Sequence, residues 1–223
     1  MTNWDFGEDV EDPIHRIHRY PAKFPAFIFT KALKYAEQQG VRVRSVADVF
    51  CGCGTTAVEA KKHGKDFWGC DINPVAVLIS QVKTHRYRDS LLGRYFDAIK
   101  RDFSRTEPTP EDHDKISDRI RYWFKEDSIR DLIRLDLAIR RQTPIRSQHR
   151  KFFLCGFSNI LKPTSLWLTK STKAQRDLQK SPRAVMDAFE EQIAQMRQAN
   201  QQLRFPTPFP RVRIRTQNFL AST

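Results

Sequence analysis

The run from Val46 to Lys62 constrains the fold more than any other part of the chain. Val46–Phe50 is a short stretch of mostly apolar or β-branched residues, which predicts a buried strand. Gly52 and Gly54 lie one residue apart and predict a tight turn, and Thr55–Lys62 predicts a helix. Such glycines let a ligand approach the backbone, and the amides that open the helix attract a carboxylate or a phosphate. The run therefore predicts a nucleotide-type binding site.

A second strand and an acidic residue extend this pattern. Phe67–Cys70 is an apolar stretch that ends at Asp71, nineteen positions after Gly52. An acid at about that distance is the expected partner of a ribose hydroxyl. Pro74 suits the first turn of a further helix. The order strand, turn, helix, strand, acid and helix predicts an α/β fold with parallel strands joined by a right-handed crossover.

The remaining residues have mainly helical periodicity. Apolar stripes at helical spacing run through residues 87–141, and a polar helix is expected from about Pro182 to Leu203. The apolar run Phe152–Phe157 is compatible with either a strand or the start of a buried helix. Arg211–Arg215 alternates in the manner of a strand, with three arginines on one side.

The excess of positive charge lies at one end of the chain. The net charge is +13, yet residues 1–82 contain 10 Lys and Arg against 10 Asp and Glu, whereas residues 137–223 contain 16 against 4. This gradient predicts a neutral ligand-binding half joined to a half that faces a polyanion, and nucleic acid is the obvious polyanion. A solvated basic surface without a partner is the alternative. The candidate DNA contacts are Lys170, Lys173, Arg176, Arg211, Arg213 and Arg215.

Several classes of protein are not expected. No apolar run approaches the roughly 20 residues that a membrane span needs. The first residues up to Asp12 are acidic and show no secretory signal. The 4 cysteines are sparse and suit small core thiols in a reducing cytoplasm better than a disulfide framework or a metal site. The expected location is the cytoplasm.

Three motifs carry a resemblance to a known family. The sequence D-V-F-C-G-C-G-T-T at Asp48–Thr56 resembles the D-x-F-x-G-x-G-T-T motif of S-adenosylmethionine-dependent DNA amino-methyltransferases. The stiff aromatic and basic loop H-R-Y-P-A-K-F-P at His18–Pro25 is similar to their H-x-Y-P-A-K-F motif. G-C-D-I-N-P at Gly69–Pro74 is similar to their G-x-D-I-N-P motif, and all three occur in the family's order.

The resemblance implies S-adenosylmethionine as the cofactor. Gly52 and Gly54 would pass close to its methionine moiety, Asp48 and Thr55 would fix its polar end, and Asp71 would accept hydrogen bonds from its ribose. A dinucleotide dehydrogenase would use the same turn and acid, but it does not call for Asp48 or the Y-P-A-K-F loop. The implied cofactor-binding residues are Tyr20, Pro21, Ala22, Lys23, Phe24, Asp48, Phe50, Gly52, Gly54, Thr55, Asp71, Ile72 and Asn73.

The chain departs from the family at its catalytic motif. Family members carry S/D/N-P-P-Y/F/W, whose polar groups hold the target amino group and whose ring stacks on the flipped base. No Pro-Pro pair occurs in this sequence, so no catalytic residue is predicted. We therefore expect the cofactor-binding subunit of a split methyltransferase, with double-stranded DNA and a second polypeptide carrying the P-P-Y half as partners.

The resemblance also implies an organisation into two regions. A partial Rossmann-like methyltransferase sheet of parallel strands is expected over residues 1–85. A largely helical, basic region for DNA recognition and partner binding is expected over residues 86–223. Two other functions remain open: a non-catalytic nucleic-acid-binding protein that senses S-adenosylmethionine, and a methyltransferase acting on RNA. Either adenine or cytosine suits the resemblance, in a setting such as restriction-modification.

Overall fold

The computed structural model describes residues 11–21, 23–168 and 173–221. Its contacts divide the chain into two compact units. Unit 1 combines the residues up to Arg86 with those from Ala199 onwards, and unit 2 comprises Tyr87–Gln198. The expected second region, 86–223, thus ends in a segment that returns to unit 1. It returns because a strand near the carboxyl end pairs with the sheet, a long-range contact that local periodicity does not reveal.

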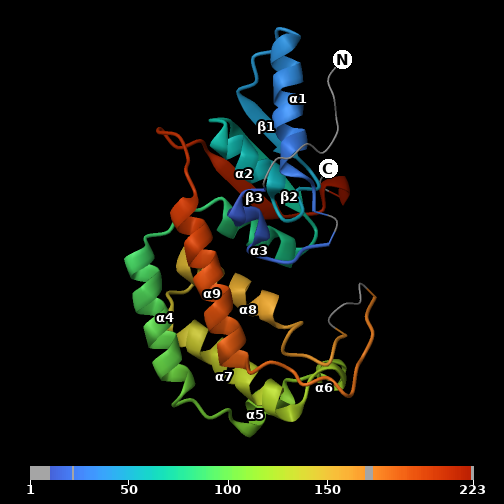
Figure 1. Ribbon diagram of the computed structural model, residues 1–223, viewed down its shortest axis with the longest axis vertical. Helices are drawn as coiled ribbons and strands as arrows, with labels where there is room; N and C mark the ends of the chain where they lie inside the picture. The colour runs from blue at the N-terminus through green and yellow to red at the C-terminus, as the bar shows by residue number, and fades with distance from the viewer. Residues whose placement is uncertain (1–10, 22, 169–172, 222–223) are drawn as a thin grey trace. The chain divides into compact units, whose positions relative to one another are not determined.

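Unit 1 is an α/β unit (Figure 1). A helix connects its first two strands, because parallel strands need a crossover between them. In chain order its elements are η1 (Pro13–Arg16), α1 (Ala26–Gln38), β1 (Ser45–Asp48), α2 (Thr55–Lys62), β2 (Asp66–Asp71), α3 (Pro74–Lys83), β3 (Val212–Thr216) and η2 (Phe219–Ala221).

The three strands form one parallel sheet in the order β1-β2-β3. Val46 pairs with Phe67, and Gly69 pairs with Ile214, so the two ends of the chain meet on β2. The predicted α/β class with parallel strands is confirmed. The strand expected at Val46–Phe50 ends earlier, at Asp48, because the Asp48 carboxylate accepts a hydrogen bond from the Phe50 amide and turns the backbone.

The core of unit 1 joins the sheet to the helices around it. Helix α2 contacts α1, α3, β1 and β2, and helix α3 also contacts β2 and β3. Removal of this apolar surface from water is the main stabilising contribution to the unit. The buried core residues are Phe29, Leu33, Cys51, Ala57, Ala60, Phe67, Val77 and Ile214.

Unit 2 is helical. Its elements are α4 (Asp89–Phe103), α5 (Pro110–Asp114), α6 (Asp118–Trp123), α7 (Glu126–Gln142), α8 (Gln148–Ile160) and most of α9 (Val185–Gln202). The ambiguous run Phe152–Phe157 lies inside α8, and Phe152, Phe153 and Phe189 are fully buried in the core of this unit. Among the described residues, no helix is both long and apolar enough to cross a membrane.

Candidate functional site

The turn between β1 and α2 has the backbone geometry that its glycines permit. Gly52 and Gly54 have φ angles of 49° and 78°, in the left-handed region that favours glycine. A Cβ atom on Gly54 would lie 2.5 Å from Ser80 Oγ, so α3 closes directly on this turn. Ser80 Oγ also donates a 2.7 Å hydrogen bond to the Gly52 carbonyl. The turn is therefore a fixed structure held from behind by α3.

Asp71 links the turn to the end of the second strand. Its Oδ2 accepts a 2.9 Å hydrogen bond from the Gly52 amide, and its Oδ1 accepts a 2.8 Å bond from the Asn73 amide. Each carboxylate oxygen has a further lone pair, so the group retains capacity to accept bonds from a ligand hydroxyl. The Asn73 side chain caps α3 by accepting a bond from the Val75 amide.

Tyr20 lies beside the same turn, although it comes from the N-terminal segment. Its Cε1 atom is 3.7 Å from the position that a Cβ on Gly52 would take, and its hydroxyl is hydrogen-bonded to the Asn73 side chain. Partial burial raises the pKa of the Tyr20 phenol, and the Asp71 carboxylate adds to the rise. Tyr20, Gly52, Asp71 and Asn73 thus form one cluster at the carboxyl ends of β1 and β2.

The site combines exposed apolar groups with a polar helix start. Phe50 and Ile72 follow the two strands and are 71% and 70% exposed. Thr55 opens α2, and its buried Oγ1 has no hydrogen-bond partner among the described residues. The first-turn amides of α2 lack acceptors within the helix and favour an anionic group. This arrangement fits a ligand with an anionic end, hydroxyl groups and a flat apolar ring, which are the features of S-adenosylmethionine.

The other predicted residues make contacts of their own or are exposed. Asp48 accepts a hydrogen bond from the Phe50 amide at the end of β1. Pro21 and Phe24 are exposed, whereas Ala22 lies outside the described residues. The Lys23 ammonium is 2.6 Å from a Glu11 carboxylate oxygen and 3.3 Å from the His15 carbonyl oxygen. Lys23 is thus engaged within the N-terminal segment.

The cysteine next to Gly52 is not suited to nucleophilic chemistry. Burial raises the pKa of the Cys51 thiol to about 12, and the Asp48 and Asp71 carboxylates add to the rise. The thiol is therefore protonated near neutral pH and is a poor nucleophile. Cys51 is part of the unit 1 core, which indicates a packing role.

Sequence reasoning missed Ser80. It is fully buried, its Oγ bonds the Gly52 carbonyl, and it limits the space behind Gly54. The only sequence signal was a small polar residue among the apolar positions of α3, which is too common to single out a site. Contact across 28 residues of sequence was needed to show its role.

Among the predicted DNA contacts of unit 2, Arg176 lies in an aromatic cluster. Lys173 is exposed, and the Arg176 guanidinium lies 4.4 Å from the centroid of the Tyr122 ring. Arg176 and Trp167 form an antiparallel bridge, and Trp167 stacks on Trp123 with ring centroids 5.6 Å apart. The bridge fixes the base of the loop that carries Lys173. Lys170 lies outside the described residues.

The other three predicted DNA contacts lie on unit 1. Arg213 and Arg215 are exposed on β3, and the alternation expected from their spacing is present because Ile214 between them is buried. Arg211 precedes the strand, and its guanidinium lies 3.0 Å from the carboxylate of Asp66 at the start of β2. The structure therefore distributes the predicted contacts between the two units.

Comparison with known proteins gives two matches. Residues 4–82, which contain the glycine turn, Tyr20 and Asp71, match a family described as DNA methylase. The chain is also similar to the type II methyltransferase M.MvaI of Kocuria varians, with 31% identity over 165 residues. That alignment covers 70% of this chain and 36% of the relative, so the chain spans about a third of the relative's length. No solved structure matches the chain.

Proposed function

Because residues 4–82 match the DNA methylase family, we propose that the chain binds S-adenosylmethionine and takes part in methylating an exocyclic amino group of adenine or cytosine in double-stranded DNA. The observation that carries the proposal is the glycine turn bordered by Tyr20 and Asp71, which lies inside the matched residues. The similarity to a type II methyltransferase supports the same reaction class.

The residues of the turn have distinct parts in binding the cofactor. The Thr55 hydroxyl and the first amides of α2 receive its carboxylate, since both lack partners in the helix. Asp71 accepts hydrogen bonds from the ribose, while the exposed Phe50 and Ile72 pack on the adenine ring. When bound, S-adenosylmethionine supplies an electrophilic methyl group. The chain contributes orientation of that group and the exclusion of water by Tyr20.

The catalytic residues come from elsewhere in this proposal. The family's S/D/N-P-P-Y/F/W motif, which holds the flipped base, has no counterpart among these 223 residues. We propose that a second polypeptide carries it. The sheet offers a place for such a chain, because the outer edge of β1 has no hydrogen-bonded neighbour among the described residues. An unpaired edge strand readily accepts a further strand.

Binding of the cofactor is tested with Asp71→Ala. We expect titration calorimetry to show at least about a tenfold loss of affinity for S-adenosylmethionine, because a hydrogen bond to a charged group contributes about 1.5–3 kcal/mol. Asp66→Ala is the matched control, since Asp66 lies at the opposite end of the same strand and bonds Arg211 instead. Failure of the unsubstituted chain to bind the cofactor would overturn the proposal.

Methyl transfer is tested with a radiolabelled methyl donor and separate DNA and RNA substrates. We expect no transfer by the purified chain alone and transfer to DNA when its native partner is co-purified. Methylation of DNA by the chain alone would refute the requirement for a second polypeptide. Transfer to RNA in place of DNA would replace the proposed substrate.

A further inference from the structure

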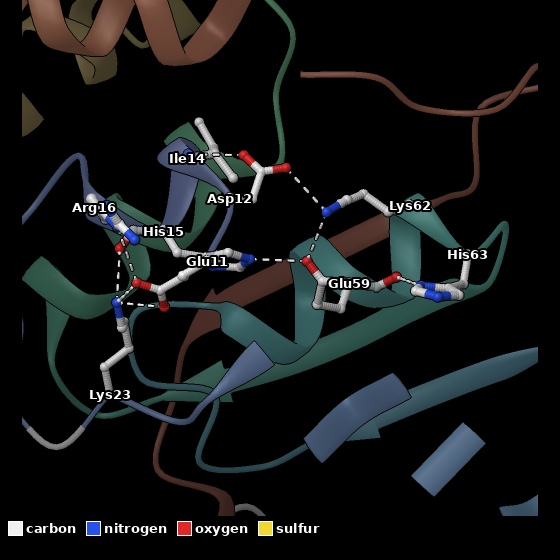
Figure 2. Close-up of polar contacts among 9 residues, drawn as sticks. All are labelled: Glu11, Asp12, Ile14, His15, Arg16, Lys23, Glu59, Lys62 and His63. Carbon is white, nitrogen blue, oxygen red and sulfur yellow. Dashed lines mark hydrogen bonds and ion pairs between the residues drawn. The ribbon is translucent and has the colours of Figure 1, made fainter. Parts of the chain in front are cut away.

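A buried hydrogen bond between two side chains joins the N-terminal segment to the helix that starts at the glycine turn. His15 lies in η1 and Glu59 lies in α2, and their side chains are 0% and 6% exposed. His15 Nε2 is 2.9 Å from Glu59 Oε1. A dashed line in Figure 2 marks this hydrogen bond. The contact spans 44 residues of sequence, so it forms only when the N-terminal segment is docked on α2.

Neighbouring groups satisfy the buried carboxylate. Lys62 Nζ lies 3.2 Å from the same Glu59 oxygen and 3.0 Å from Asp12 Oδ2 (Figure 2). Burial opposes ionisation of Glu59, but the hydrogen bond from His15 and the charge of Lys62 hold its pKa below the usual range. Asp12 in turn caps η1 by accepting a bond from the Ile14 amide. The network therefore anchors η1 on α2 by two side chains, His15 and Asp12.

Polar contacts of Lys23 also connect the later part of the N-terminal segment to its beginning. Lys23 Nζ contacts both the Glu11 carboxylate and the His15 carbonyl oxygen, at 2.6 Å and 3.3 Å. Between these fixed points the chain carries Tyr20 to the side of Gly52 and Asn73. The position of Tyr20 is thus set at one end by the anchor on α2. No contact of His15 or Glu59 with the turn itself is needed for this effect.

We propose that His15 and Glu59 are positioning residues that hold the N-terminal loop so that Tyr20 borders the cofactor site. The inference rests on the proposed function, since it assumes that the ligand of the glycine turn is S-adenosylmethionine. A buried polar pair has fewer acceptable geometries than two apolar side chains. Removing one of its partners destabilises the folded chain. Such a pair fixes the loop in one register on α2, and the affinity for the cofactor depends on that register.

Two substitutions that differ by one methylene test the role of His15. In His15→Gln the amide nitrogen reaches about as far as Nε2 and can still donate to Glu59, whereas in His15→Asn it falls short. We expect titration calorimetry on the full chain to show at least about a tenfold weaker affinity for S-adenosylmethionine in His15→Asn. His15→Gln should stay within about threefold of the unsubstituted chain. Hydrogen exchange in the loop around Tyr20 should accelerate only in His15→Asn.

The control separates loop positioning from general loss of stability. Ile99→Val removes a methyl group from a fully buried side chain of unit 2 and should lower the melting temperature without changing cofactor affinity. Should His15→Asn fail to fold, Glu59→Gln keeps the size of the acceptor and removes its charge, and we expect at least about a threefold loss of affinity.

The outcomes distinguish this inference from the proposed function. If the unsubstituted chain does not bind S-adenosylmethionine, the proposed function fails. If it binds and His15→Asn binds equally well, with unchanged hydrogen exchange at the loop, the positioning role is overturned. If His15→Asn does not fold and Glu59→Gln binds as the unsubstituted chain does, the positioning role is overturned as well.

Discussion

At Gly54, the backbone conformation and the available space both exclude a larger residue. Its φ of 78° lies in the left-handed region, and α3 brings Ser80 against the side where a Cβ would stand. Gly40 has a similar φ of 76° but nothing within 4 Å of the corresponding position. A comparison of substitutions at the two glycines therefore separates the free-energy cost of the left-handed conformation from the cost of close packing.

Gly54→Ala should destabilise the chain more than Gly40→Ala. The left-handed backbone costs about 1–2 kcal/mol in either variant. Overlap with Ser80 adds about 1–3 kcal/mol at position 54 alone, because α3 must move. Urea unfolding followed by circular dichroism measures both free energies. Equal losses of stability in the two variants would contradict the packing argument.

His18 makes the stability of the folded chain depend on pH in the mildly acidic range. Burial lowers the pKa of His18 to about 4 from its ordinary value of 6.5, and the charge of Lys83 adds to the decrease. The unfolded chain therefore binds a proton between these pH values that the folded chain does not, and stability falls as the pH falls through this window. Between pH 6.5 and pH 5 the loss is at most about 2 kcal/mol, since one proton changes the stability by at most about 1.4 kcal/mol per pH unit.

His18→Gln should remove this part of the pH dependence. Unfolding at several pH values from 6.5 to 5 gives the slope for each protein, and the difference between the two slopes isolates His18 from the other titrating groups. We expect the variant to have the shallower slope. Identical slopes would show that His18 keeps its ordinary pKa in the folded chain.

At the scale of elements, the loop after α8 is held at its base by aromatic side chains. Trp167 bridges Arg176 and stacks on Trp123, while the Arg176 guanidinium lies over Tyr122. Arg176 thus supports the loop, and the exposed Lys173 is better placed for contact with a phosphate. This separates two residues that the sequence had grouped together as DNA contacts.

Lys173→Ala should weaken DNA binding mainly through the phosphate backbone. A plot of log affinity against log salt concentration has a negative slope. Removing one lysine–phosphate interaction makes this slope less steep by about 0.9. Lys34→Ala is the control, because Lys34 is an exposed lysine on α1 and should leave the slope unchanged. Fluorescence anisotropy with duplex DNA at several salt concentrations measures both slopes. An unchanged slope in Lys173→Ala would assign this loop to another role.

For the molecule as a whole, the main consequence of the fold is that unit 1 is discontinuous. β3 follows unit 2 in sequence but pairs with β2 from Phe67 to Asp71, and Ile214 completes the core. Arg211 at the start of this segment is bonded to Asp66 through both its amide and its guanidinium. Residues 1–86 alone therefore lack a strand and part of their core.

A fusion that joins residues 1–86 to residues 199–223 through a flexible linker should unfold cooperatively. Residues 1–86 alone should not, because β2 then has an open edge and Phe67 loses its cover by Ile214. Thermal unfolding followed by circular dichroism compares the two fragments. Introducing Ile214→Asp into the fusion should abolish the transition. A cooperative transition for residues 1–86 alone would contradict the assignment of β3 to this unit.

Much of unit 1 followed from local sequence. The glycine turn, the helix at Thr55–Lys62 and the proline that opens α3 were predictable because backbone conformation and helix capping depend on neighbouring residues. The parallel sheet was predictable because two strands separated by a helix require a crossover. The position of Asp71 at the end of β2 followed from the same reasoning, although its assignment as a ribose partner stays a prediction.

Other features were decided only by the tertiary structure. The run Phe152–Phe157 is helical because it packs against Phe189 and Ile193 in unit 2, and apolar content alone does not distinguish a helix from a strand there. The pairing of β3, the contact of Ser80 with the turn and the His15–Glu59 pair each join residues far apart in the chain. Local sequence determined the conformation of the glycine turn, whereas long-range packing decided which side chains surround it.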